Sequence, residues 1–251
     1  MTQEQVVNIA AEISYLMLKN GAEIYRVEQC VRFIGNAYGY KEVDCFAILT
    51  SIVVTIADGD KVCTRTKRVA DRATDLNVVT ELNDLSRYIC AKLPEYEEVK
   101  ELVKAVKEMK QYPFWVFTLS YMMISFFFSL YFGGTWITSL ICGLVGVVVY
   151  PIQRFGEHVK ANLFMVNMLT SGAVTLLLCI THQFFNLHQL DIMVISLIMN
   201  LVPGVALTHC MRDLISNELV SGMARLAEVF ISGSGTAVGV FVILTMFGIQ
   251  I

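Results

Sequence analysis

Polar and charged residues interrupt an apolar stretch that runs from residue 198 to residue 213. Six of its residues could either contact a polar solute or interrupt the helix that this stretch forms: Asn200, Pro203, Gly204, His209, Arg212 and Asp213. Proline removes a backbone donor and clashes with the preceding turn, so the helix should break near Val202. In lipid, freed backbone groups persist only where protein or water satisfies them, and transporters form solute sites at such broken helices. The stretch therefore predicts a polar solute site within a membrane, with a simple proline kink as the alternative.

The chemistry expected of this site is recognition of a negatively charged group on the solute. Backbone N–H groups at the start of the second half-helix, with the helix dipole, would favour a negatively charged group. Asn200 would add side-chain hydrogen bonds, and Asn167 in the preceding apolar segment is a further candidate for contacting the solute. We expect Arg212 and Asp213 either to pair as a gate or to take part in proton coupling. An interfacial anchor is the alternative role for these two charges.

The charges of the 251-residue chain divide it into two parts. The chain is 55% hydrophobic with a mean hydropathy of +0.59, which is too apolar for an ordinary soluble domain. Residues 1–113 hold 32 of its 41 charged residues, and residues 114–251 hold nine. The sequence therefore predicts a cytosolic domain over residues 1–113 and a transmembrane domain over residues 114–251.

The second part contains five apolar segments of 17 to 23 residues, at 114–132, 135–152, 163–181, 192–208 and 229–251. As helices they would extend about 25–35 Å, enough to cross a hydrocarbon core. Lys and Arg occur in the connections 153–162 and 209–228, but not in 133–134 or 182–191. Basic residues favour the cytoplasmic side, so the N-terminus is expected inside and the C-terminus outside. Gly235-x-x-x-Gly239 in the last segment predicts a close approach between two helices.

The first part is expected to be a small α+β domain. Apolar periodicity predicts helices at 3–19, 24–37, 76–93 and 95–110 and strands at 43–49, 51–57 and 61–65. Asp58-Gly59-Asp60 indicates a hairpin between the last two strands. Arg26 can reach Glu23 or Ala22 one turn back, and Arg32 can reach Glu28 at i,i+4, although such charges also suit a simple solvated face.

Composition excludes several classes of function. Residues 1–113 contain no histidine, no glycine-rich phosphate loop and no nucleophile elbow, so no catalytic residues are expected. The seven cysteines are odd in number and form no Cys-x-x-Cys pair, so we expect no metal site, cofactor or disulfide framework. A net charge of −3 without a basic patch argues against a nucleic-acid partner. The polar N-terminus is not expected to act as a signal peptide.

Two motifs resemble those of the threonine/serine exporter family. Gly21-Ala-Glu-Ile-Tyr-Arg-Val-Glu28 is similar to the opening motif of the family, and Leu201 to Asp213, continued by Leu219 to Glu228, is similar to its membrane signature. The resemblance covers most of the chain and singles out Gly21, Glu23, Arg26, Glu28 and Arg68 in the N-terminal domain. His209 departs from the pattern, which has a polar residue such as asparagine there.

The resemblance implies a subunit rather than a whole exporter. Full-length members combine a cytosolic domain with about ten spans, whereas five are expected here, as in the split, YjjP-like form associated with succinate export. This implies a multi-pass subunit of a secondary exporter in the cell membrane, carrying a small carboxylate or amino acid. Its expected partners are the lipid bilayer, the substrate and a second small membrane subunit, a second copy of itself, or both. Two other functional interpretations remain open: a membrane-bound hydrolase and a multi-pass membrane sensor, each using the N-terminal domain.

Overall fold

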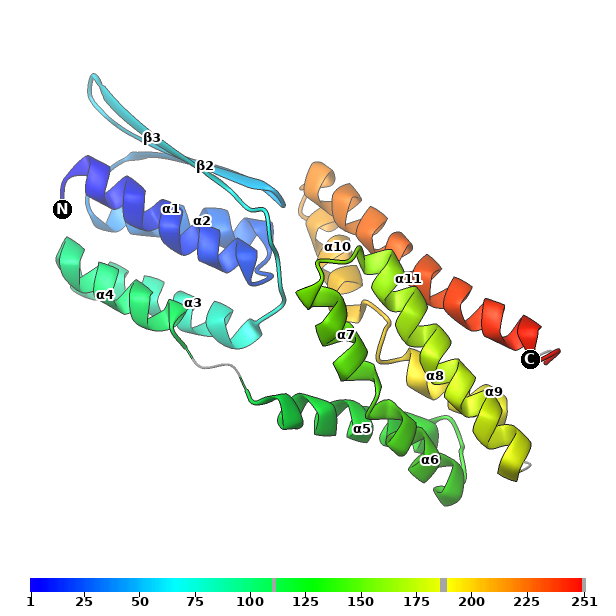
Figure 1. Cartoon of the computed structure of the whole chain (residues 1–251). Helices are drawn as coiled ribbons and strands as arrows, with labels where there is room; N and C mark the ends of the chain where they lie inside the picture. The colour runs from blue at the N-terminus through cyan, green and yellow to red at the C-terminus, as the bar shows by residue number, and fades with distance from the viewer. Residues whose placement is uncertain (110–111, 186–188, 250–251) are drawn as a thin grey trace. The chain divides into compact units, whose positions relative to one another are not determined.

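The computed structural model describes residues 1–109, 112–185 and 189–249. His188 and part of the expected outer connection 182–191 lie outside these residues. The chain forms two compact units (Figure 1). The first comprises Met1–Lys110 and Thr208–Arg225, and the second comprises Gln111–Leu207 and Leu226–Ile251. The segment Thr208–Arg225, which follows the interrupted helix, therefore folds with the charged N-terminal part of the chain.

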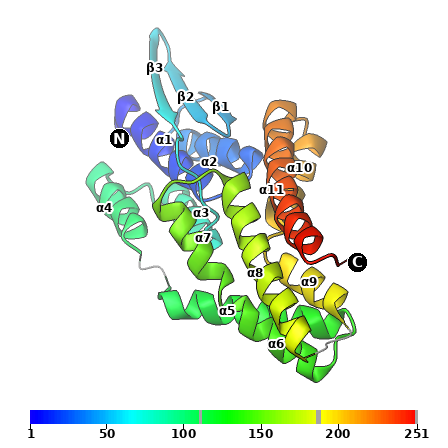
Figure 2. The same cartoon turned by 45° about the vertical axis from the view of Figure 1, so that its right-hand side comes forward.

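The first unit is an α+β fold, as its periodicity predicts. Its elements are α1 (Gln3–Lys19), α2 (Ile24–Ala37), β1 (Glu42–Ile48), β2 (Ser51–Asp58), β3 (Lys61–Arg68), α3 (Leu76–Lys92) and α4 (Tyr96–Lys107). The three strands form one antiparallel sheet in the order β1-β2-β3. Helices α1 and α2 lie between this sheet and helices α3 and α4 (Figures 1 and 2). Each predicted element is present, with ends within three residues of those expected.

Local sequence chemistry fixes the ends of these elements. A reciprocal capping box starts α1, because Thr2 accepts from the backbone of Gln5 while the Gln5 side chain accepts from Thr2. Gly59 adopts φ +58° in the two-residue turn between β2 and β3. Ile52, Val54 and Ile56 alternate along β2 and are fully buried against the helices. This inward face of the sheet and the apolar stripes of α1 and α2 form the core of the unit.

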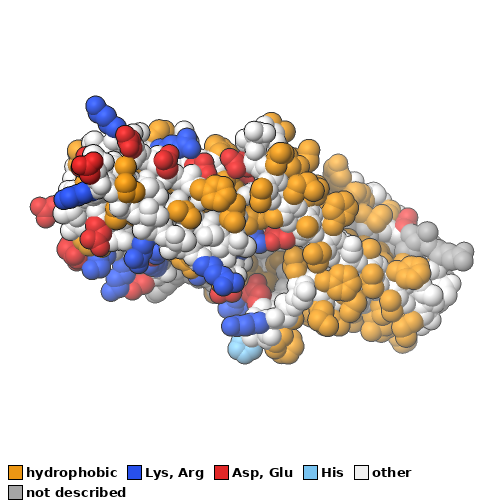
Figure 3. All heavy atoms as spheres, turned by 90° about the horizontal axis from the view of Figure 1, so that it is seen from above, with side chains coloured by type: hydrophobic (Ala, Val, Ile, Leu, Met, Phe, Trp, Pro, Cys, Tyr) orange, Lys and Arg blue, Asp and Glu red, His pale blue; other side chains and the backbone are white. Residues whose placement is uncertain are grey.

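The second unit consists of apolar helices. It contains α5 (Phe114–Tyr131), α6 (Trp136–Gly146), α7 (Val149–His158), α8 (Leu163–Phe185), α9 (Leu190–Ile198), the start of α10 (Gly204–Ile215) and most of α11 (Leu219–Met246). By length and hydropathy, four segments of the described residues can cross a membrane: Phe114–Tyr131, Trp136–His158, Leu163–Phe184 and Leu219–Met246. Hydrophobic side chains cover the surface of these helices, whereas charged ones gather over the first unit (Figure 3).

The predicted fourth span differs most from a simple helix. The chain leaves helical geometry between α9 and α10, which end and begin at Ile198 and Gly204, so the predicted break is confirmed. Helix α9 has nine residues and is too short to cross a bilayer alone. Met193 and Leu197 on α9 are nevertheless fully buried in the core of the second unit. Protein rather than lipid therefore surrounds much of this short helix.

The connection between the fourth and fifth segments is helical, and the expectation of a loop at 209–228 is wrong. Helix α10 continues through His209 to Ile215, and α11 begins at Leu219, ten residues before the predicted start at 229. Only a short turn separates them, where Asn217 adopts φ +67°. Arg212, Asp213 and Arg225 break the apolar run of this stretch, but they lie on helices and pair within the first unit. Charge alone therefore does not identify a loop here.

Glycines allow α11 to pack directly on α8. A Cβ on Gly235 would lie 2.5 Å from the carbonyl oxygen of Phe164, and one on Gly239 would meet the backbone of Met168 and Gly172. A Cβ on Gly233 would meet nothing within 4 Å. The Gly235-x-x-x-Gly239 pair thus provides the close helix approach that its spacing predicts.

Candidate functional site

The N-terminal motif begins with a turn that only glycine suits. Gly21 adopts φ +90° just beyond the end of α1. Its N–H donates to the carbonyl of Leu18, and the N–H of Ala22 donates to that of Met17, which is the Schellman pattern of helix ending. The turn buries Ala22 and delivers Glu23 to the start of α2. The Gly-Ala-Glu sequence therefore positions one backbone carbonyl and one carboxylate at a fixed corner of the first unit.

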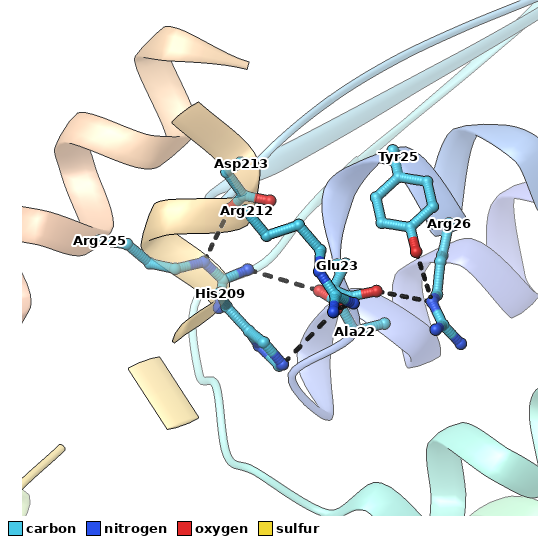
Figure 4. A network of polar contacts seen from close by, with 8 residues as sticks. All are labelled: Ala22, Glu23, Tyr25, Arg26, His209, Arg212, Asp213 and Arg225. Carbon is cyan, nitrogen blue, oxygen red and sulfur yellow. Dashed lines mark hydrogen bonds and ion pairs between the residues drawn. The ribbon is translucent and has the colours of Figure 1, made fainter. Parts of the chain in front are cut away.

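Glu23 is a buried carboxylate that is shared among three basic side chains (Figure 4). Its side chain is 7% exposed, and its Oε1 accepts a hydrogen bond from Nη1 of Arg212. Nε of Arg26 lies 2.6 Å from Oε2, as the one-turn spacing predicts, and donates its hydrogen bond to the hydroxyl of Tyr25. Nε2 of His209 lies 3.9 Å from Oε1. Glu23 caps no backbone group of α2, so its carboxylate serves these side chains instead.

A second, more deeply buried ion pair joins α10 to the start of α11. Nε of Arg225 donates to Oδ2 of Asp213 at 3.0 Å, and the two side chains are 8% and 0% exposed. Arg225 also donates from Nη2 to the carbonyl of Ala22 at 3.4 Å. One arginine thus ties α10, α11 and the Gly21 turn together. Burial raises the pKa of Asp213 above its ordinary value, while the Arg225 guanidinium acts in the opposite direction.

Arg212 and Asp213 do not pair with each other, so that form of the expected gate is wrong. Adjacent residues on a helix point to different faces. Arg212 extends to Glu23, and Asp213 turns inward to Arg225. Burial lowers the pKa of His209, and the positive charge of Arg225 lowers it further, although Glu23 acts the other way. Burial and the charge of Arg225 therefore favour the neutral form of the His209 imidazole.

The ion pairs around Glu23 and Asp213 form one polar group of side chains, called here the Glu23 cluster: Glu23, Arg26, His209, Arg212, Asp213 and Arg225. Two residues of the N-terminal motif lie outside the Glu23 cluster. Glu28 accepts from the backbone N–H of Ala47 at 3.2 Å and pairs with Arg32 at 3.4 Å, so it joins α2 to β1. Its burial raises its pKa, and the Ala47 hydrogen bond opposes that shift. Arg68 is exposed at the end of β3, and its side chain forms no hydrogen bond or ion pair with any described residue.

The two predicted asparagines lie in the second unit, in separate polar contacts. On α8, the side chain of Asn167 is buried and donates to Oγ of Ser232 on α11 at 2.6 Å. Asn200 lies in the break after α9 and donates to Oγ of Ser125 on α5 at 2.7 Å. Its Oδ1 is buried and accepts no hydrogen bond from the described residues. Asn200 thus retains a buried acceptor that a solute or a water molecule could use.

The break supplies a cavity but differs from the expected carboxylate cradle. The N–H of Gly204 donates to the carbonyl of Val202 at 2.8 Å, so this amide at the half-helix start is already engaged. Pro203, Val202 and Leu201 line a mainly apolar cavity of about 670 Å³ with Phe230 and Thr236 of α11. The sequence motif therefore marks a real interruption of the helix, and the cavity beside it is lined mostly by hydrophobic side chains.

Sequence reasoning missed Arg225, which is central to the cluster. The sequence does contain a sign of its importance, because Arg225 is an isolated cation at the start of an apolar helix, and such residues are costly to bury and often functional.

Among the described residues, no group of three or more His, Cys, Asp or Glu is arranged to hold a metal ion.

Comparison with known proteins places this arrangement in a family of transporters. Residues 8–247 match the ThrE family model, described as "Putative threonine/serine exporter". The chain is 24% identical to "Probable succinate transporter subunit YjjP" of Klebsiella aerogenes, over 99% of this chain and 96% of that protein. It is 23% identical to the protein of the same name in Escherichia coli, over 99% and 97% of the two chains.

A longer relative is named "Probable threonine/serine exporter", from Mycobacterium tuberculosis, and is 23% identical over 98% of this chain but only 48% of its own length. These relatives are named as transporters and exporters, not as enzymes. No solved structure is significantly similar to the chain. Four membrane-competent helical segments occur among its described residues, so the protein is a multi-pass membrane transporter component, and the chain belongs to the threonine/serine exporter family.

Proposed function

We propose that this chain is one subunit of a secondary exporter in the cell membrane that moves a small carboxylate-bearing metabolite outward. Threonine, serine and succinate are the substrates to test, because the relatives are named for them. All three carry a carboxylate, which an arginine side chain can bind with two hydrogen bonds. The observation that carries the proposal is the half-exposed Arg212, held by the buried Glu23 beside an interrupted helix.

A second membrane subunit is expected to complete the exporter. The chain spans almost the full length of relatives that are named as subunits, but about half the length of two relatives named as exporters. We infer from the names of the subunit relatives that a partner chain, a second copy of this chain, or both complete the exporter.

The contacts of the first unit support five crossings. Three membrane-competent segments separate residues 1–110 from Thr208–Arg225. An odd number of crossings would put these two parts on opposite sides of the bilayer, yet Arg212 and Arg225 bond to Glu23 and Ala22. These contacts favour a fourth crossing, and the short α9 with the interrupted stretch after it is the segment available for it. Helix α11 then makes the fifth.

The distribution of basic residues supports a cytoplasmic first unit. Arg154 lies in the C-terminal half of α7 and Lys160 lies between α7 and α8, and Arg212 lies in the first unit itself. The short α5–α6 connection carries no Lys or Arg. Lys and Arg are enriched on the cytoplasmic side, which supports an N-terminus inside and a C-terminus outside.

The proposed mechanism is an exchange of carboxylates on Arg212. Arg212 is 51% exposed although it is bound to Glu23, whereas Arg225 is 8% exposed and already bound to Asp213 and Ala22. A substrate carboxylate can therefore reach Arg212 and compete with Glu23 for it. Release of Glu23 would free α10, whose N-terminal end begins at the break, to move relative to α2. Asn200, with its unused buried acceptor, is proposed to hold the solute further along its path.

Efflux measurements test this role. Cells expressing the chain with its candidate partner are loaded with labelled threonine, serine or succinate, and export is followed over time. Arg212→Gln removes the charge that the substrate would bind, and is expected to reduce export of the transported solute about tenfold or more. Asn200→Ala is expected to reduce export as well.

Arg32→Gln is the matched control, because Arg32 is 57% exposed and pairs with a carboxylate in the same unit. It should export normally. The proposed site is wrong if Arg212→Gln and Asn200→Ala both export at the wild-type rate at equal membrane abundance.

A further inference from the structure

Five basic side chains surround one hollow of the first unit, away from the Glu23 cluster. They come from two elements: Arg65 and Lys67 of β3, and Lys100, Lys104 and Lys107 of α4. Residues 65 and 67 are two apart on a strand and share a face. Residues 100, 104 and 107 share one face of a helix. The hollow has a volume of about 550 Å³, within the range of small-molecule sites.

The strand register shows that the two β3 cations lie on the inward face of the sheet. Arg65 pairs with Val54 and Lys67 with Ile52, and both β2 partners are fully buried against the helices. Cross-strand partners project from the same face of a sheet. An edge strand with apolar residues at these positions would extend the core. Arg65 and Lys67 instead leave a charged hollow between β3, α1 and α4.

Positive charge is in excess within this hollow. Its acidic residues are Glu12, Glu97 and Glu101, against five cations. The amino groups of Lys67 and Lys107 both bind the carboxylate of Glu12, one on each oxygen. Burial lowers the pKa of Lys67, and the neighbouring charge of Lys107 lowers it further. Lys100 pairs with Glu97 at 3.4 Å and Lys104 with Glu108 at 3.8 Å, and the side chains of both pairs are exposed. Arg65 forms no ion pair with any described residue, so its charge is uncompensated.

We propose that this hollow binds a small polyanion, a soluble metabolite bearing two or more phosphate or carboxylate groups. Lysines act as point charges toward such groups, and arginine adds a planar fork of donors. Tyr96 lines the same hollow and offers an aromatic face. The site is separate from the Glu23 cluster, so it provides a place for a cytosolic anion to regulate the exporter.

Binding is tested on the full chain in a neutral detergent, using pyrophosphate, ATP and citrate as probes in separate titrations. Sodium chloride at matched ionic strength is the reference for nonspecific charge effects. Isothermal titration should give saturable binding of at least one probe. Arg65→Gln with Lys104→Gln removes two exposed cations of the hollow and should raise the dissociation constant about tenfold or more. Lys41→Gln with Lys92→Gln removes two exposed cations elsewhere in the same unit and should leave it unchanged.

The comparison between probes identifies the ligand chemistry. Binding of ATP and pyrophosphate without citrate assigns the site to phosphates, and the reverse assigns it to carboxylates. Inward-facing cations can also serve merely to protect a sheet edge from pairing. In that case none of the probes binds saturably, or the two double variants respond alike, and either result overturns the proposal. Export can be measured separately, so failure here leaves the Arg212 mechanism intact.

Discussion

An Asp213→Ala variant is expected to lose about 3–5 kcal/mol of stability, because it leaves a buried guanidinium without its counter-charge. Arg225 is 8% exposed and keeps only the 3.4 Å hydrogen bond to Ala22 once Asp213 is removed. Arginine cannot shed its proton in a protein, so the charge cannot be neutralised. Denaturation of the purified protein in detergent measures the loss.

A double variant separates the orphaned charge from the lost contact. Asp213→Ala combined with Arg225→Met leaves no unpaired charge and should recover much of the stability. At acid pH, Arg225→Met alone should cost less stability than Asp213→Ala, because the unpaired Asp213 can take up a proton and become neutral. Removing Arg225 raises the pKa of Asp213 further above its unfolded value, so the folded form binds the proton more tightly. The free energy of unfolding of this variant should therefore rise as pH falls from the folded pKa of Asp213 toward its lower, unfolded pKa.

Glu157→Ala is the matched control for the buried pair. Glu157 forms an arginine ion pair with Arg154 at 3.1 Å, but its side chain is 69% exposed. Exposed pairs contribute about 0–1 kcal/mol, so this variant should behave like the wild type. Equal losses for Asp213→Ala and Glu157→Ala, or a double variant no more stable than Asp213→Ala, would show that the buried pair does not hold the cluster.

The second large effect is expected from Gly239→Ala, which should separate α11 from α8. The added methyl group would overlap the carbonyl of Met168 and lie 2.9 Å from the backbone nitrogen of Gly172, neither of which can rotate away. The helices would have to move apart, weakening the hydrogen bond from Asn167 to Ser232. Overpacking of this kind costs about 1–3 kcal/mol. Thermal stability in detergent is the measurement.

Gly233→Ala tests the same substitution on the same helix without the contact. Its methyl group would meet nothing within 4 Å, so only helix propensity changes, and alanine is favoured over glycine by about 1 kcal/mol. The two variants should therefore shift stability in opposite directions. If Gly239→Ala is as stable as Gly233→Ala, the close packing of α8 and α11 is not correct.

Local patterns predict most of the fold of this chain. Apolar periodicity, the Asn20-Gly21 ending and the Asp58-Gly59-Asp60 turn act within a few residues, and the first unit follows them closely. The pairing of Arg26 with Glu23 is also local and is confirmed. The helices at 209–228 were missed because charges that pair with distant partners resemble loop residues when the partners are unknown.

The candidate site could be predicted only in part, because its central contacts join residues far apart in the sequence. Arg212 and Glu23 are 189 positions apart, and Arg225 and Ala22 are 203 apart. No spacing rule links such pairs. Both motifs could be found in the sequence, but only the folded structure shows that their residues contact each other within one unit. The same applies to Asn200, whose partner Ser125 lies 75 positions away.

The central claim is that the first unit, including Thr208–Arg225, lies on the cytoplasmic face of a five-crossing protein. Single cysteines at Asp44, Tyr131, Ser216 and Met246, placed in a cysteine-free background, test it with a membrane-impermeant maleimide. In intact cells, Tyr131→Cys and Met246→Cys should be labelled, whereas Asp44→Cys and Ser216→Cys should react only after permeabilisation. Labelling of Ser216→Cys from outside, with Asp44→Cys protected, would contradict the fourth crossing and the account that depends on it.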